Sequence, residues 1–111
     1  MYSTITDLIN AAKPLCKGKI LTQDSKEELL SWQKTGQKDY QYGFCLEAWN
    51  GLIGHRGDVP GYQCVLGYDQ DRDLSIVVIC NLSNDAKGRG PANEIASLIL
   101  SSIRETANKN D

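Results

Sequence analysis

Residues 49–68 read WNGLIGHRGDVPGYQCVLGY, and two turn signals divide this stretch into strands. Asn50-Gly51 is a dipeptide typical of a two-residue β-hairpin turn. Pro60-Gly61 marks the next reversal, because proline fixes φ and glycine accepts the positive φ that many tight turns require. The stretch therefore predicts two antiparallel strands, at about residues 52–57 and 62–68.

The flanking sequence extends this hairpin into an antiparallel meander. Upstream, residues 40–49 read as a strand that enters the Asn50-Gly51 turn. Downstream, the polar run 69–73 predicts another turn, and residues 74–82, the most apolar of these segments, predict the last strand. We therefore expect the strands of the sheet to lie between residues 40 and 82.

Helices are expected on both sides of this meander. Helical spacing of apolar residues predicts the first over about 4–17 and the second over about 23–32, capped by Thr4 and Thr22. A third helix is predicted over about 91–107, where a proline suits the first helical position. Helices placed before and after a run of antiparallel strands make an α+β fold. The buried face of the third helix is expected to hold Ile95, Leu98, Ile99 and Ile103.

The composition is that of an ordinary globular protein. Its 111 residues and 12.3 kDa suit a single domain over residues 1–111. Twelve Lys and Arg against fourteen Asp and Glu give a net charge of −2, which argues against a nucleic-acid partner. No run approaches the ~20 apolar residues that span a bilayer, so no membrane partner is expected. Residues 1–4 lack the features of a signal peptide, which predicts a soluble, cytoplasmic protein as the chain stands.

The sequence predicts no metal site and no cofactor. The four cysteines are Cys16, Cys45, Cys64 and Cys80. None forms the close pair that a structural zinc site uses, and the single histidine, His55, cannot complete a histidine-rich site. Free thiols are favoured, and a disulfide between neighbouring strands stays open as an alternative. Asp69, Asp71 and Asp73 alternate as calcium ligands do, but no acidic residue follows at calcium-loop spacing, so a solvated hairpin turn is the preferred interpretation.

Several short motifs follow one another in a definite order along the chain. They are Tyr42-Gly43-Phe44, His55-Arg56-Gly57, Pro60-Gly61-Tyr62, the acidic turn 69–73 and the apolar strand that ends in Asn81. Their order resembles the C-terminal part of the penicillin-binding-protein-like serine hydrolases, which include class C β-lactamases, D-alanyl-D-alanine carboxypeptidases and related esterases. The resemblance covers nearly all of this chain but only the last portion of a family member. It implies the C-terminal part of a serine β-lactamase-like domain, with the C-terminal helix on one face of the sheet and the N-terminal helices elsewhere on the sheet or around its rim.

Three elements meet in the active site of that family, and one of them has a convincing counterpart here. The family uses Ser-x-x-Lys for the nucleophile, Tyr-x-Asn for proton transfer, and Lys-Thr-Gly or His-x-Gly on the sheet edge. His55-Arg56-Gly57 matches the last of these. We expect this motif to lie on a strand that borders an open groove, with His55 partly exposed to solvent.

The resemblance implies a role for each residue of the motif. His55 would face the nucleophile, and Gly57 would let the strand approach the substrate. The backbone N–H of Asp58 would be one donor of an oxyanion hole, where a fixed donor stabilises developing charge. Arg56 stands where the family often has a hydroxyl residue, so the resemblance does not identify a carboxylate ligand. The alternative is that His55 is simply an exposed strand residue.

Two literal motif matches are better explained by chance. Lys34-Thr35-Gly36 spells the third family motif and Ser31-x-x-Lys34 spells the first, yet the two overlap at Lys34. In the family these elements lie far apart in the sequence and face each other across a cleft. Ser31 stands at the end of a predicted helix, whereas the family nucleophile stands at the start of a buried one. No Tyr-x-Asn occurs in the sequence.

Two hypotheses of function follow. The first is a truncated or split serine-hydrolase module that supplies one wall of an active site and is inactive alone. The second is a non-catalytic domain that keeps the fold in order to bind a protein or a small ligand. In the resembled family, strands that this chain lacks continue the sheet beyond residues 74–82. Because Ser75–Asn81 is apolar on both faces, as buried strands are, we expect it to form a homodimer with a second copy or to pair with a complementing chain.

Overall fold

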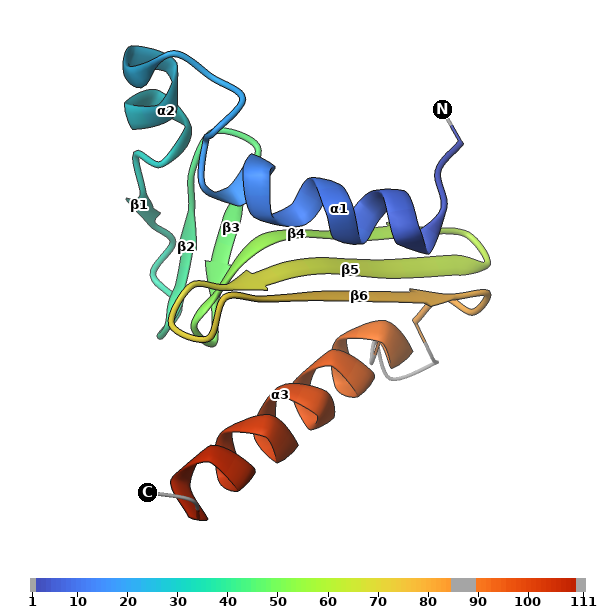
Figure 1. Cartoon of the computed structure of the whole chain (residues 1–111). Helices are drawn as coiled ribbons and strands as arrows, with labels where there is room; N and C mark the ends of the chain where they lie inside the picture. The colour runs from blue at the N-terminus through green and yellow to red at the C-terminus, as the bar shows by residue number, and fades with distance from the viewer. Residues whose placement is uncertain (1, 85–89, 110–111) are drawn as a thin grey trace.

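A computed structural model describes residues 2–84 and 90–109. The helices are α1 (Ile5–Cys16), α2 (Gln23–Leu29) and α3 (Pro91–Lys109). The strands are β1 (Gln33–Lys34), β2 (Tyr40–Tyr42), β3 (Glu47–Trp49), β4 (Leu52–Val59), β5 (Tyr62–Asp69) and β6 (Leu74–Cys80). They form one antiparallel sheet in the order β1-β2-β3-β4-β5-β6, which confirms the predicted α+β meander (Figure 1). Within the described ranges, no helix has the length and apolar character needed to cross a membrane.

Both predicted helix caps are present. The Thr4 hydroxyl oxygen accepts a hydrogen bond from the backbone N–H of Asp7 at 3.1 Å, and Thr22 does the same for Ser25 at 3.4 Å. Each cap satisfies one of the N–H groups that a helix start leaves without an intrahelical partner. The second helix is shorter than predicted: it ends at Leu29, and the chain then enters the short strand β1.

The predicted strand over residues 40–49 is wrong, because this segment is a hairpin. β2 and β3 pair with each other, and the Gly43 N–H donates to the Leu46 carbonyl oxygen at 2.8 Å across the connecting turn. Cys45 has a φ of 61°, a left-handed conformation that a continuous strand excludes. The next reversal is the predicted one, since Asn50 and Gly51 have φ values of 48° and 77°.

The length of β4 leaves part of its backbone open. β4 and β5 pair from Leu52–Asp69 to Val59–Tyr62. On the other side of β4, β3 pairs only with the segment 52–54. The outer edge of β4 from His55 to Val59 therefore has no strand partner within the part of the chain that the structure describes.

The helices α1 and α3 cover opposite faces of the sheet over β5 and β6, while α2 lies near β1 and β2 (Figure 1). On the first face, α1 buries Ala12 and Cys16 completely, and the Cys16 thiol lies 3.2 Å from the Ile53 carbonyl oxygen. The core on the opposite face consists of Leu52, Val65, Ile76, Val78, Ala92, Ala96 and Leu100.

The third helix does not bury its predicted face. Of that face, only Ile103 is half-buried. The other three residues of that face are exposed: Ile95 by 41%, Leu98 by 68% and Ile99 by 40%. The residues that pack on the sheet are mostly smaller: Ala92, Ala96 and Leu100.

Polar contacts at both ends of α3 account for this rotation. At its start, the buried Gln63 side chain accepts a hydrogen bond from the backbone N–H of Ala92 at 2.9 Å. Further along, Arg104 donates to the carbonyl oxygen of Asn50 at 2.6 Å. These contacts fix which side of the helix meets the sheet, and the spacing of apolar residues within the helix contains no information about them.

Candidate functional site

His55 lies where the unpaired edge of β4 begins, and its side chain is 47% exposed. The Tyr42 hydroxyl lies 3.0 Å from His55 Nε2, within hydrogen-bond distance. The two rings meet edge to face, with centroids 6.1 Å apart. The turn between β2 and β3 places Tyr42 level with Glu47 and Gly54 in the sheet, which brings the hydroxyl close to the imidazole.

A buried carboxylate connects His55 with the residue that follows it. The Glu47 side chain is 8% exposed, and its Oε2 accepts a hydrogen bond from Arg56 Nε at 2.5 Å. Its Oε1 lies 3.8 Å from His55 Nε2. An imidazolium at His55 would therefore have a carboxylate neighbour, while Arg56 balances the buried charge of Glu47.

Arg56 belongs to a different face of the sheet from His55. Successive strand residues point to opposite faces, and the Arg56 guanidinium lies over two neighbouring rings on the α3 side. Its guanidinium carbon is 5.2 Å from the centroid of Tyr40 and 5.1 Å from that of Trp49, a cation–π arrangement. His55 and Arg56 therefore leave β4 toward opposite faces, and the Glu47 carboxylate is a group that both side chains approach.

The remaining motif residues also make contacts within the sheet. Gly57 points to the same face as His55, and a Cβ added there would lie 3.0 Å from the Cys64 Sγ. A larger residue would therefore crowd the neighbouring strand, which gives Gly57 a packing role. The Asp58 carboxylate accepts a hydrogen bond from the Gln63 amide at 3.2 Å on the α3 side.

A hollow of about 780 Å³ is present in the described residues, and His55 is not part of its lining. It lies at the end of the sheet near β1, β2 and β3, and its lining includes Lys34, Lys38, Tyr40 and Trp49. The literal motif matches fall in this region rather than at β4. Ser31 is exposed just beyond the end of α2, and Lys34 is exposed on β1.

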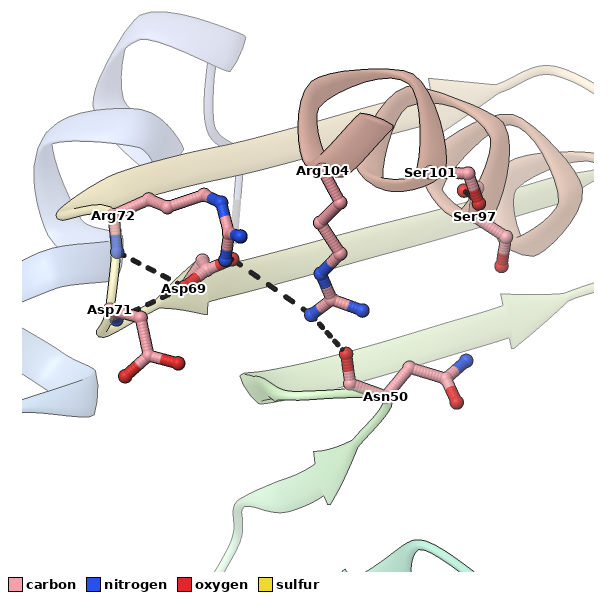
Figure 2. Close-up of polar contacts among 7 residues, drawn as sticks. All are labelled: Asn50, Asp69, Asp71, Arg72, Ser97, Ser101 and Arg104. Carbon is pink, nitrogen blue, oxygen red and sulfur yellow. Dashed lines mark hydrogen bonds and ion pairs between the residues drawn. The ribbon is translucent and has the colours of Figure 1, made fainter. Parts of the chain in front are cut away.

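The acidic turn after β5 is not a simple solvated turn, which corrects the sequence interpretation. Asp69 is 1% exposed and accepts hydrogen bonds from the backbone N–H groups of Asp71 at 3.0 Å and Arg72 at 3.2 Å (Figure 2). Its other oxygen lies 3.2 Å from Arg72 Nη1 and 3.9 Å from Arg104 Nη2. Because Arg104 also bonds to Asn50, this cluster joins α3 to the β3–β4 turn and the β5–β6 turn, which lie at the same end of the sheet.

A second polar cluster anchors α1 to the same end of the sheet. Asp73 contacts Lys13 and accepts a hydrogen bond from the Tyr68 hydroxyl, and Lys17 lies 3.6 Å from the Asp73 carboxylate. The hydrogen bond from Lys13, followed by that from Tyr68, lowers the pKa of Asp73 to about 2. Burial raises the pKa of the nearby Cys16 thiol to about 11.

Among the described residues, no three His, Cys, Asp or Glu side chains are grouped as metal ligands would be. All four cysteines are free thiols, and Cys45 is exposed. On the neighbouring strands β5 and β6, Cys64 is paired in register with Ile79, so it lies on the opposite face of the sheet from Cys80.

Sequence reasoning missed Tyr42, Glu47 and Gln63 as contributors to this region. Tyr42 was considered only as part of a motif, because a strand over residues 40–49 does not place it beside His55. Glu47 and Gln63 are buried polar residues, with 6% and 3% of the whole residue exposed. Strand alternation alone does not identify their partners. The sequence offers no signal for Gln63, because the residue before Pro91 is Gly90 and glycine is itself a common helix N-cap.

Comparison with known proteins gives one positive result. The family model described as Beta-lactamase matches residues 1–101, which is most of the chain. No curated protein matches the sequence. The matched range includes every strand of the sheet, the His55 region and the first half of α3.

Proposed function

The chain belongs to the β-lactamase family, and from this premise we propose that it forms the sheet-side wall of a serine-hydrolase active site. The observation that carries the proposal is the placement of His55. It is half exposed at the start of the unpaired edge of β4, and Tyr42 and Glu47 hold its Nε2 side. A fixed, accessible imidazole beside an open strand edge is suited to proton transfer at a bound substrate.

His55 and Tyr42 can exchange a proton across their 3.0 Å contact. When the phenol donates to Nε2, the imidazole Nδ1 carries the ring proton and can donate it toward a ligand. The Glu47 carboxylate lies 3.8 Å from the same Nε2 atom. These groups provide acid–base chemistry, but they do not include a nucleophile.

In this proposal the unpaired backbone edge of β4 binds the substrate. An extended substrate can add to an open strand edge through main-chain hydrogen bonds. Along residues 55–59 this edge would position the substrate, and the backbone N–H of Asp58 would stabilise developing negative charge on a carbonyl oxygen. Gly57 keeps the strand close to Cys64 and free of a protruding side chain.

We propose that the chain is inactive as a hydrolase when it is alone. Covalent catalysis needs a nucleophile within hydrogen-bond reach of its base. The only Ser-x-x-Lys in the sequence is Ser31 to Lys34, and both residues are exposed near α2 and β1, away from His55. The nucleophile would therefore have to come from outside these 111 residues.

A non-catalytic binding domain is the second candidate, and the environment of Arg56 favours it. Arg56 stands where the family often has a hydroxyl residue, and here it is held by Glu47, Tyr40 and Trp49. A motif position that has become part of the packing is compatible with loss of catalysis. In this case the open edge of β4 would bind a ligand without turning it over.

The first experiment tests activity. The isolated chain is incubated with a chromogenic cephalosporin and an aryl ester, and mass spectrometry follows acylation. We expect neither turnover nor a covalent adduct. Turnover that Ser31→Ala abolishes would refute the proposal and assign the nucleophile to the motif at residues 31–34.

The second experiment tests the wall itself. An acylated D-alanyl-D-alanine dipeptide is titrated into labelled protein, and NMR follows the backbone amides and the His55 ring. We expect shifts along residues 55–59, and a weaker response in Tyr42→Phe, which removes the hydroxyl but keeps the ring. Gln41→Ala, on the same strand, is the control that should respond as the wild type does. Shifts confined to other segments would contradict the wall, and binding at 55–59 that Tyr42→Phe leaves unchanged would favour the simple binding domain.

A further inference from the structure

The short segment that follows α2 contacts the strand that carries Tyr42. We call residues 32–35 the support segment; it contains β1 and overlaps both literal motif matches. Gln33 of this segment pairs with Tyr42 in the sheet, and Tyr42 pairs with Glu47 on its other side. The backbone of Tyr42 is therefore held between two strands, and the support segment supplies one of them (Figure 1).

A hydroxyl group attaches the support segment to the opposite end of the same strand. Thr35 Oγ1 donates a hydrogen bond to the carbonyl oxygen of Tyr40 at 2.9 Å. Because β2 has only three residues, the pairing of Gln33 and the bond from Thr35 fix both of its ends. The literal match at residues 34–36 thus has a structural explanation, since its threonine holds β2 in place.

The indole of Trp32 packs against the backbone of Gly43, the residue after Tyr42. A Cβ added at Gly43 would lie 3.1 Å from Trp32 Cζ3 and 2.8 Å from the carbonyl oxygen of Leu29. These distances leave no room for a side chain, so the ring lies directly against the backbone of the turn. Trp32, which is half-buried, therefore limits how far this turn can move toward α2.

The turn that Trp32 contacts contains a residue in a strained conformation. Cys45 has a φ of 61°, and a residue other than glycine keeps such a conformation only where the surrounding structure determines it. The surroundings include the hydrogen bond from the Gly43 N–H to the carbonyl oxygen of Leu46, at 2.8 Å, and the buried Leu46 side chain. The indole of Trp32 is the third such contact, so its loss should let the turn relax.

We propose that the support segment positions the Tyr42 hydroxyl against His55, with Trp32 as its main positioning residue. The inference rests on the proposed function, because it concerns the same site. Only the 3.0 Å contact between the hydroxyl and Nε2 joins the two side chains, and a contact of this kind must be held to within about 0.5 Å by its neighbours. Trp32 acts on the imidazole through Tyr42, so it is not itself a catalytic residue.

NMR of the ligand-free chain tests this directly, because His55 is the only histidine in the sequence. The ring ¹⁵N shifts of an imidazole depend on its tautomer and its hydrogen bonds. Tyr42→Phe gives the change in the Nε2 signal when the hydroxyl is absent. We expect Trp32→Ala to produce half of that change or more, and Trp32→Phe, which keeps a ring, to restore most of the wild-type signal. The double variant of Trp32→Ala and Tyr42→Phe should go no further than Tyr42→Phe alone.

Two other variants separate positioning from stability. Thr35→Val removes the hydroxyl but keeps the shape of the side chain, and it should move the Nε2 signal of His55 in the same direction. It decides the question if Trp32→Ala does not fold. Leu100→Ala removes a core side chain of α3, so it should destabilise the fold and leave the His55 signal unchanged. A His55 signal that Trp32→Ala and Thr35→Val leave in place would refute the inference, as would an equal change in Leu100→Ala.

Titration with the acylated D-alanyl-D-alanine dipeptide distinguishes this inference from the proposed function. If both hold, Trp32→Ala and Tyr42→Phe should each raise the dissociation constant about two- to tenfold, and the double variant should raise it no more. If the wild type does not bind the dipeptide but Trp32→Ala changes the His55 signal, the proposed wall is wrong and the positioning is supported. If the wild type binds at residues 55–59 and Trp32→Ala changes neither measurement, the positioning is wrong and the wall is supported.

Discussion

Asp69 should contribute more to the stability of this protein than any other carboxylate in the acidic turn. Its side chain is 1% exposed and accepts two backbone hydrogen bonds from the turn that it precedes. It also lies 3.2 Å from Arg72 and 3.9 Å from Arg104 (Figure 2). Removing the carboxylate leaves the two backbone N–H groups of the turn without their acceptor, which costs about 1–3 kcal/mol. The two arginines are 30% and 36% exposed, so water can solvate them when the carboxylate is gone.

The perturbation is Asp69→Ala, and urea and thermal unfolding followed by circular dichroism measure its effect. A loss of about 1–3 kcal/mol is a substantial share of the ~5–15 kcal/mol that stabilises a domain of this size. It corresponds to a fall in Tm of about 4–12 °C. Asp69→Asn keeps an oxygen for the two backbone N–H groups and loses only the charge, so its loss should be smaller, about 1 kcal/mol.

Asp71→Ala is the matched control, because Asp71 lies two residues away in the same turn and is exposed. Its substitution should change the unfolding free energy by less than about 0.5 kcal/mol. The reasoning is refuted if Asp69→Ala unfolds at the same urea concentration as Asp71→Ala. In that case the turn would be held by its backbone alone, and the sequence interpretation of a solvated turn would stand.

Three further predictions concern other parts of the molecule. The hydrogen bond from Lys13 helps to hold the pKa of Asp73 at about 2. This carboxylate should therefore stabilise the fold above about pH 4 and lose its effect as the pH falls to about 2. Urea unfolding of wild type and Asp73→Asn should differ at neutral pH and converge at about pH 2. Because burial raises the pKa of Cys16 to about 11, iodoacetamide at mildly alkaline pH should modify the exposed Cys45 and spare Cys16 until the chain unfolds, as peptide mass spectrometry would report. Arg56→Lys should lower the unfolding free energy by about 1–2 kcal/mol, since an ammonium group cannot stack on the Tyr40 and Trp49 rings as a planar guanidinium does. An unchanged melting curve would show that the rings pack without it.

The parts of the fold that sequence reasoning predicted well depend on neighbouring residues. The caps Thr4 and Thr22 bond to residues three positions on, and Asn50-Gly51 adopts the positive φ values that its hairpin turn requires. The failures depend on distant residues. The rotation of α3 follows from a hydrogen bond between Gln63 and Ala92, which are 29 positions apart. Apolar spacing within a helix identifies a hydrophobic side but not the contacts that turn it.

At the candidate site, too, features set by neighbouring residues were predicted and features set by distant residues were not. The exposure of His55 was predicted, because it lies on a strand between two clear turns. Its contact with Tyr42 was not, because it depends on the turn at residues 43–46, where Cys45 takes a left-handed conformation without being glycine. Such a conformation is uncommon for this residue type, so a strand that continued to Trp49 was the natural prediction. The contact between His55 and Tyr42 could therefore not be predicted without knowing that the chain reverses at residues 43–46.

The same contacts that anchor α3 also determine what the protein leaves exposed. If hydrophobicity alone set the rotation of α3, Ile95, Leu98 and Ile99 would cover the sheet, and its alanines would face solvent. Gln63 and Arg104 turn the helix so that alanines pack on the sheet and the large side chains stay exposed. Exposing three large apolar residues costs several kcal/mol of the stabilisation that burial would give, at about 1.5–3 kcal/mol for each fully buried side chain. Apolar spacing would not select this rotation, so the polar contacts of Gln63 and Arg104 are what determine it.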